Sequence, residues 1–93
     1  MEFIKTENGF AKYDEEGKLI AEITYASTSD PNVVEANHTF VDSSLRGQGV
    51  AGKLLNTLVN DMNKQNKKIK ATCSYVVKKF EEDSSYDFIN AEK

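Results

Sequence analysis

The sequence predicts an α+β fold in which an antiparallel β-meander is followed by a strand, a helix, a strand and a helix, with all strands in one mixed sheet. In the first half, apolar residues alternate with a period of two between turns rich in glycine, asparagine and aspartate, which is typical of hairpins. In the second half, apolar residues recur at helical spacing. The chain has 93 residues, of which 39% are hydrophobic, so we expect one core and a single domain over residues 1–93.

Four strands are expected in the first half of the chain. Two short strands at residues 2–5 and 9–13 are separated by the turn signal Asn8-Gly9, and a second turn at residues 14–17 ends in glycine. The third strand follows from apolar residues at every second position from 19 to 25. The fourth spans residues 33–41, where strict alternation places Val34, Ala36, His38 and Phe40 on one face and Glu35, Asn37, Thr39 and Val41 on the other.

The second half predicts a long helix, a fifth strand and a short helix. The long helix begins near Gln48 and ends within residues 63–66, and its apolar face comprises Val50, Leu54, Leu55, Leu58, Val59 and Met62. Alternation over residues 69–75 predicts the fifth strand, which we expect to be parallel to the fourth or splayed from it, with a right-handed crossover. Residues 76–82 are expected to form the short helix, and the tail is expected to dock through Tyr86, Phe88 and Ile89.

The composition argues against several classes of function. The net charge is −3 and the lysines are spread along the sequence, so nucleic-acid binding is not expected. No apolar stretch approaches the ~20 residues of a membrane span, and because a strand-like segment follows Met1, no signal peptide is expected. The single cysteine allows no internal disulfide, and a cytoplasmic location is the simplest interpretation. One histidine and one cysteine do not make a ligand set, so no metal site is expected.

The most unusual segment is Arg-Gly-Gln-Gly-Val-Ala at residues 46–51, which lies between a strand and an amphipathic helix. Gly47 and Gly49 allow backbone conformations that a Cβ would forbid, and they let a ligand approach the chain closely. Unpaired N–H groups and the dipole at the helix start favour an anion, so a phosphate or pyrophosphate is the expected ligand. Arg46, the only arginine, can add a charge-assisted contact. The alternative is a glycine-rich loop that merely reverses the chain.

This segment resembles a known signature. Arg46-x-x-Gly49-x-Ala51, after a strand and at the start of a helix, is similar to the Gln/Arg-x-x-Gly-x-Gly/Ala signature with which the GNAT superfamily of N-acetyltransferases binds acetyl-CoA. The stretches 38–41 and 45–51, together with Cys73-Ser74-Tyr75, resemble the small single-domain GNAT-like subgroup. The resemblance runs from about residue 9 to residue 80.

The resemblance implies a cofactor, a binding mode and an activity. The pyrophosphate of acetyl-CoA or coenzyme A would be held by backbone N–H groups of Gly47, Gln48, Gly49, Val50 and Ala51. The strand ending at Phe40 and Val41 would pair with the pantetheine arm, and the fifth strand would splay from it. Cys73, Ser74 and Tyr75 would line the slot for the thioester, and the acetyl group would pass to an amine.

The sequence departs from full-size members of this family at one point. Those proteins place helices between their first two strands to shape the acceptor pocket, whereas residues 4–9 leave no room for them. The sequence therefore does not decide whether the acceptor is a small molecule, a polyamine or a peptide. The chain is expected to be a monomer or a weak dimer. An alternative function is a CoA-binding regulatory or interaction module with little transferase activity.

Three side chains are candidates for the chemistry, each with a structural alternative. Cys73 is either a thiol that takes the acetyl group or assists its transfer, or a small buried hydrophobic residue. His38 is either a general base for the incoming ammonium or a hydrogen-bonded core residue. Tyr75 is either a proton donor to the leaving CoA thiolate, as the resemblance implies, or a packing residue. Glu35 is a further carboxylate that can activate an amine through water, or else a solvated residue.

Overall fold

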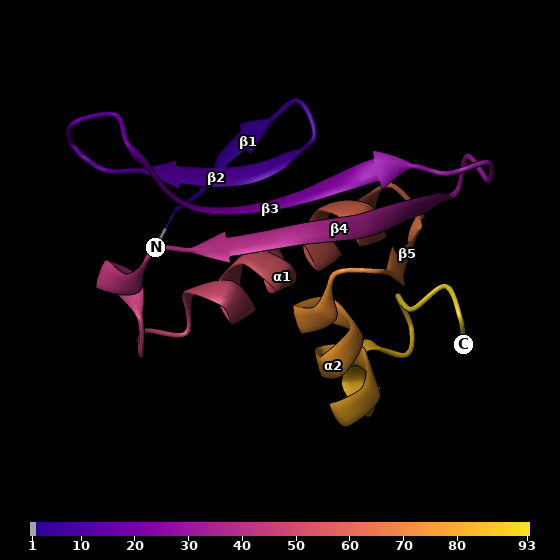
Figure 1. Ribbon diagram of the computed structural model, residues 1–93. Coiled ribbons are helices and arrows are strands. Elements are labelled where there is room, and N and C mark those ends of the chain that lie inside the picture. The colour runs from indigo at the N-terminus through magenta and orange to yellow at the C-terminus, as the bar shows by residue number, and fades with distance from the viewer. Residues whose placement is uncertain (1) are drawn as a thin grey trace.

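The computed structural model describes residues 2–93 as one five-stranded sheet with its helices gathered on one side (Figure 1). The elements are β1 (Ile4–Thr6), β2 (Gly9–Tyr13), β3 (Leu19–Ser27), β4 (Val33–Val41), α1 (Val50–Lys64), β5 (Lys68–Ala71) and α2 (Ser74–Glu82). Two short 3-10 helices are η1 (Ser43–Leu45) and η2 (Ser84–Tyr86). The strand order is β1-β2-β3-β4-β5, antiparallel up to β4, and β5 runs parallel to β4. This is the predicted mixed α+β sheet.

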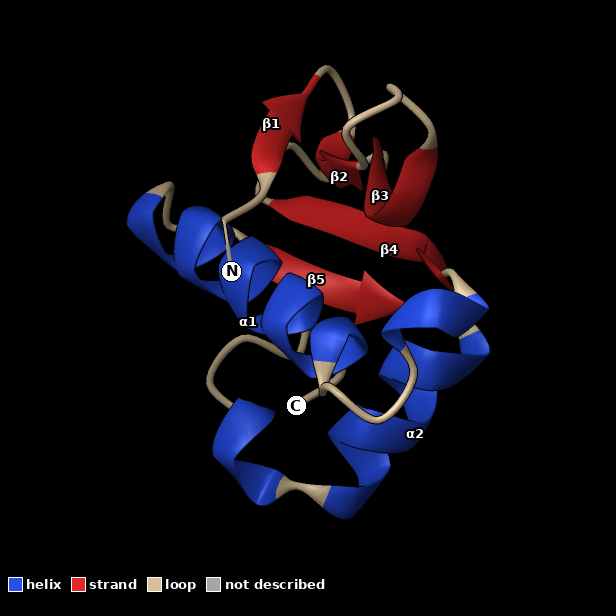
Figure 2. Ribbon diagram, turned by 90° about the vertical axis from the view of Figure 1, so that its left-hand side faces the viewer, coloured by secondary structure: helices blue, strands red, loops and turns tan. Residues whose placement is uncertain are grey.

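The core lies between the sheet and α1. The predicted apolar face of α1 is fully buried, at 4% exposure or less, against Ala21, Ile23, Val34, Ala36 and Ile69 of the sheet. Figure 2 shows α1 running along the sheet with α2 beside it, and no described helix covers the opposite face. Within residues 2–93, no helix is long and apolar enough to cross a bilayer.

A bulge in β4 overturns the predicted alternation of that strand. Thr24 pairs with His38 and Tyr25 pairs with Ala36, so Asn37 has no partner across the ladder. Because one extra residue inverts the phase of a strand, the residues after Asn37 change faces. The prediction that His38 and Phe40 share the face of Val34 and Ala36 was therefore wrong.

The faces after the bulge follow from the register. Thr39 and Val41 lie opposite Ile23 and Ala21, whose side chains are fully buried on the helix side. His38 and Phe40 lie opposite Thr24 and Glu22 on the uncovered side. His38 is exposed, so its structural alternative as a core residue was also wrong.

The fifth strand is shorter than predicted. Its pairing with β4 ends at Ala36 and Ala71, and the N–H groups of Thr72 and Cys73 both donate to the Ala36 carbonyl, at 3.1 and 3.0 Å. The chain then turns into α2, so Ser74 and Tyr75 are helical and not part of the strand. β4 continues to Val41 paired only with β3, so β4 and β5 separate beyond Ala36 and Ala71.

The C-terminal tail packs beside β5. The N–H of Ile69 donates to the Ile89 carbonyl at 2.7 Å, and the N–H of Ala91 donates to the Ile69 carbonyl at 2.8 Å. Ile89 is buried and the Tyr86 ring lies 5.5 Å from that of Phe80. The predicted docking is therefore confirmed for these two residues, but it was wrong for Phe88, which is 51% exposed.

Candidate functional site

The N-terminus of α1 has no internal partner for its donors. Its N-cap is Gly49, with φ +69°, and no side chain caps the helix. Gly47 also has a positive φ of +80°. Among residues 2–93, no acceptor is hydrogen-bonded to the N–H groups of residues 47–52, whereas the N–H of Lys53 already bonds to the Gly49 carbonyl at 3.1 Å. A run of unpaired donors at a helix start is suited to an anion.

These donors lie at a cavity of about 320 Å³ between the end of β4, the start of α1 and one side of α2. The lining residues are Val41, Leu45, Arg46, Gly47, Gly49, Val50, Ala51, Gly52, Tyr75 and Lys79. The two charged side chains among them, Arg46 and Lys79, are both cations. The Tyr75 hydroxyl lies 3.7 Å from the point where a Cβ on Gly52 would stand, so the Tyr75 side chain reaches the first turn of α1. We call this space the cationic cavity.

The structure places most of the predicted cofactor residues at the cationic cavity. Val41, Arg46, Gly47, Gly49, Val50 and Ala51 all line it. Gln48 is exposed and lies outside the lining, as does Ser74, and Phe40 faces the uncovered side of the sheet. Three lining residues were not among the predicted site residues: Leu45, Gly52 and Lys79. Lys79 follows Tyr75 by four residues, a helical spacing that the predicted strand through Tyr75 concealed.

Cys73 lies where β4 and β5 separate. Its thiol is 3.4 Å from the Thr39 hydroxyl, and it is the N-cap residue of α2. Burial raises the pKa of the Cys73 thiol, but hydrogen bonds from the Thr39 hydroxyl and from backbone N–H groups at the start of α2 outweigh it. The net pKa is therefore below the ordinary value, which favours the nucleophilic thiolate.

Tyr75 lies in the first turn of α2 and lines the cationic cavity. Burial, followed by the charge interaction with Tyr86, raises the pKa of the Tyr75 hydroxyl. The hydroxyl therefore stays protonated at neutral pH and remains available as a donor.

His38 and Glu35 are not brought to the same side as Cys73. Both belong to the uncovered face of the sheet, because Glu35 lies opposite Ala26 and His38 lies opposite Thr24 in the ladder. The Thr72 hydroxyl donates to Glu35 Oε2 at 2.8 Å, which places this carboxylate beside the end of β5. The expectation that Glu35 and His38 face opposite ways was wrong, for the same reason as above: the bulge lies between them.

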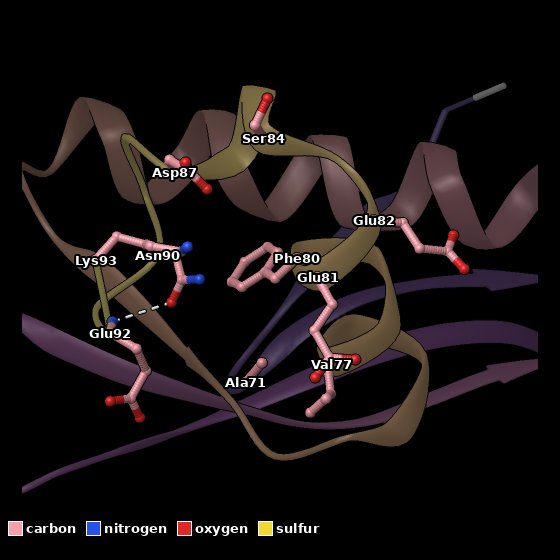
Figure 3. A pocket seen from close by; sticks show the side chains of 10 residues that line it. All are labelled: Ala71, Val77, Phe80, Glu81, Glu82, Ser84, Asp87, Asn90, Glu92 and Lys93. Carbon is pink, nitrogen blue, oxygen red and sulfur yellow. Dashed lines mark hydrogen bonds between the residues drawn. The ribbon is translucent and has the colours of Figure 1, made fainter.

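A second cavity, of about 520 Å³, lies on the other side of α2 beside the C-terminal tail (Figure 3). The Phe80 ring points toward the Asn90 side chain there, and the carboxylate-bearing residues of its lining are Glu81, Glu82, Asp87 and Glu92. Lys93 is the one basic side chain in this lining. Although this acidic cavity is the larger, its charge opposes a phosphate ester, so the cationic cavity is the better site for one.

The chain matches known proteins in both sequence and structure. A sequence profile of the GCN5-related N-acetyl-transferases matches residues 9–89. The NMR solution structure of a GCN5-like protein from Staphylococcus aureus is 38% identical in sequence, with a TM-score of 0.79, and the match covers 96% of this chain and 86% of that chain. Comparison with curated proteins gives no match.

Two crystal structures of larger proteins share the fold. A GNAT-family N-acetyltransferase from Escherichia coli, solved in complex with CoA, is 24% identical with a TM-score of 0.56, covering 66% of this chain and 37% of that chain. An acetyltransferase from Bacillus cereus is 22% identical with a TM-score of 0.55, covering 73% of this chain and 45% of that chain. This chain thus spans less than half the length of either. Since the profile and the S. aureus protein match most of its length, the chain belongs to the GCN5-related N-acetyltransferase family, a family of acyltransferases.

Proposed function

We propose that this protein transfers an acetyl group from acetyl-CoA to an amine, within a single domain over residues 1–93. The observation that carries the proposal is the run of N–H groups at residues 47–52 without an acceptor among the described residues, beside a cavity whose charged side chains are cations. A pyrophosphate fits this donor set, because backbone N–H groups and a helix dipole stabilise its charge without requiring a counter-ion.

The separation of β4 and β5 supports a place for the pantetheine arm. Beyond Ala36, the side of β4 that faced β5 has no strand partner, so its backbone groups toward Val41 can pair with the amides of pantetheine. This path leads from the cationic cavity, which Val41 lines, to the thiol of Cys73 beside Thr39. The thioester would then lie at the point where the strands diverge.

Two routes of transfer fit these residues. In the first, the amine attacks the thioester carbonyl directly, the bond to the CoA sulfur breaks, and the Tyr75 hydroxyl donates a proton to the leaving thiolate. In the second, the Cys73 thiolate attacks the carbonyl and releases CoA, and the amine then attacks the acetyl-cysteine, breaking its carbon–sulfur bond and releasing the Cys73 thiolate. The lowered pKa of Cys73 supports the second route, and the protonated Tyr75 serves both.

The acceptor amine would approach from the uncovered face of the sheet. His38 and Glu35 present a base and a carboxylate on that face, on the side of the sheet opposite the contact between Cys73 and Thr39. An ammonium must lose a proton before it attacks, and either group can accept this proton directly or through water. His38 and Glu35 are therefore assigned to the acceptor, and Cys73 and Tyr75 to the thioester.

The experiment that tests the proposal has two stages. Acetyl-CoA is titrated while backbone amide shifts are followed, and we expect the largest changes at residues 47–52. The loaded protein is then assayed with amines, polyamines and peptides, in the wild type and in Cys73→Ala. No shift at millimolar ligand would refute the proposal. Binding without turnover on any acceptor would favour the CoA-binding regulatory module, and full activity of Cys73→Ala would exclude the acetyl-cysteine route.

A further inference from the structure

We propose that Lys79 of α2 binds the pyrophosphate of the cofactor, from the side of the cationic cavity opposite the N-terminus of α1. This inference rests on the proposed function but assigns a residue outside the glycine-containing loop. Lys79 and the loop residues Gly47 and Gly49 line the same cavity of about 320 Å³. An anion bound by the N–H groups of the loop therefore lies in the cavity that Lys79 also lines.

The position of Lys79 is set by the contact between α1 and α2. Tyr75 and Lys79 lie one turn apart on α2, on the same face of that helix. The Tyr75 hydroxyl approaches Gly52 in the first turn of α1, at 3.7 Å from a Cβ built there. The ammonium of Lys79 stands 5.9 Å from the centre of the Tyr75 ring. The Tyr75 ring thus lies beside Lys79, and the Tyr75 hydroxyl lies beside the N-terminus of α1.

Lys79 makes no close ion pair with a carboxylate among the described residues, although, after the hydrogen bonds from Ser85, its charge contributes to lowering the pKa of the Asp83 carboxyl. Its neighbour Lys78 pairs with Glu82 at 3.8 Å on the solvent side of α2, with 75% of its side chain exposed. Among residues 2–93, Lys79 has no carboxylate oxygen within 4.0 Å. Asp83, four residues further on, accepts instead from the N–H and the hydroxyl of Ser85, at 2.9 and 2.6 Å. An ammonium without an ion pair, bordering a cavity with no acidic side chain, is suited to an anion from outside the chain.

CoA carries two charged groups, the pyrophosphate and the 3′-phosphate. We assign Lys79 to the pyrophosphate because Lys79 and the loop line the same cavity. The loop N–H groups lie on the α1 side of the cavity and Lys79 on the α2 side, so one diphosphate between them meets both. Pantetheine lacks both phosphate groups, and dephospho-CoA lacks only the 3′-phosphate. Comparing the affinities of CoA, dephospho-CoA and pantetheine therefore distinguishes a contact with the pyrophosphate from a contact with the 3′-phosphate.

The test compares Lys79→Gln with Lys78→Gln, a matched loss of one charge on the adjacent, paired lysine. Calorimetric titrations use CoA, dephospho-CoA and pantetheine, and thermal unfolding checks that both variants remain folded. We expect Lys79→Gln to weaken CoA and dephospho-CoA equally, by about five- to tenfold for a lost charge-assisted contact at a partly exposed site, and to leave pantetheine unchanged. Lys78→Gln should bind all three as the wild type does.

The outcomes separate this inference from the proposed function. If the wild type binds CoA and Lys79→Gln binds it equally well, the inference is wrong and the proposed function stands. If the loss is confined to CoA and spares dephospho-CoA, the lysine meets the 3′-phosphate and the assignment is overturned. If the wild type itself binds no CoA, the proposed function fails, and this inference fails with it.

Discussion

A pair of alanine substitutions separates the contribution of Gly49 to folding from its contribution to ligand binding. Gly49 at the start of α1 and Gly17 in the turn between β2 and β3 have φ of +69° and +83°. A Cβ added at either position would meet no atom within 4 Å. Gly49→Ala and Gly17→Ala therefore introduce the same backbone strain, with no clash to add to it.

The magnitude follows from the left-handed conformation alone. An alanine in this region costs about 1–2 kcal/mol, and each kcal/mol lowers the unfolding temperature of a domain of this size by about 4–8 °C. In urea or thermal unfolding, the free energy of unfolding of both variants should fall by this amount. Their affinities for CoA should differ, because the open space at Gly49 belongs to the cationic cavity while that at Gly17 does not.

The assay is therefore unfolding and CoA titration on the same two proteins. We expect Gly17→Ala to bind CoA as the wild type does, and Gly49→Ala to bind it more weakly because its methyl group occupies space needed by the phosphates. Equal CoA affinity of both variants would refute the assignment of the loop as the binding site. A much larger loss of stability in one variant than in the other would refute the reasoning about strain.

Three further predictions concern the sheet, the thiol and the tail. Gly9→Ala should cost more than about 3 kcal/mol in urea unfolding, because its Cβ would stand 1.9 Å from the Ile23 carbonyl oxygen; near-wild-type stability would contradict the register of β2 and β3. Thr39→Val should raise the pKa of the Cys73 thiol, because the hydroxyl that is removed stabilises the thiolate. Iodoacetamide should therefore alkylate Cys73 more slowly in the variant at neutral pH, and an unchanged rate would disprove the contact. Ile89→Ala should destabilise the protein by about 2–5 kcal/mol because the side chain is 1% exposed, whereas an effect below that range would mean that the tail does not pack as described.

Periodicity was a good guide wherever one face of an element is buried and its phase is unbroken. The bounds of β2 and β4 and the apolar face of α1 were predicted correctly for this reason. The bulge at Asn37 could not be predicted, because no glycine or proline marks it and both possible faces of the strand contain apolar residues. It moved His38 and Phe40 to the other side of the sheet.

The same limitation affected α2. Residues 69–75 alternate as a strand does, but the pairing with β4 ends at Ala71, next to the bulge in β4, and the chain forms a helix from Ser74. That change of element brought Lys79 to the cavity, and no local sequence signal indicates it. The loop at residues 46–51 was recognisable because its glycines serve backbone geometry, which short motifs record directly.

The short helix α2 stands between two cavities of unlike charge. Lys79 borders one and Glu81 the other, and two residues apart on a helix point to nearly opposite sides. Side chains of opposite charge therefore lie on the two flanks of a helix about 10 Å wide, a distance similar to the screening length of about 8 Å at physiological ionic strength. A polyanion close to the protein would be repelled by one flank and attracted by the other, and both effects should weaken as salt is added.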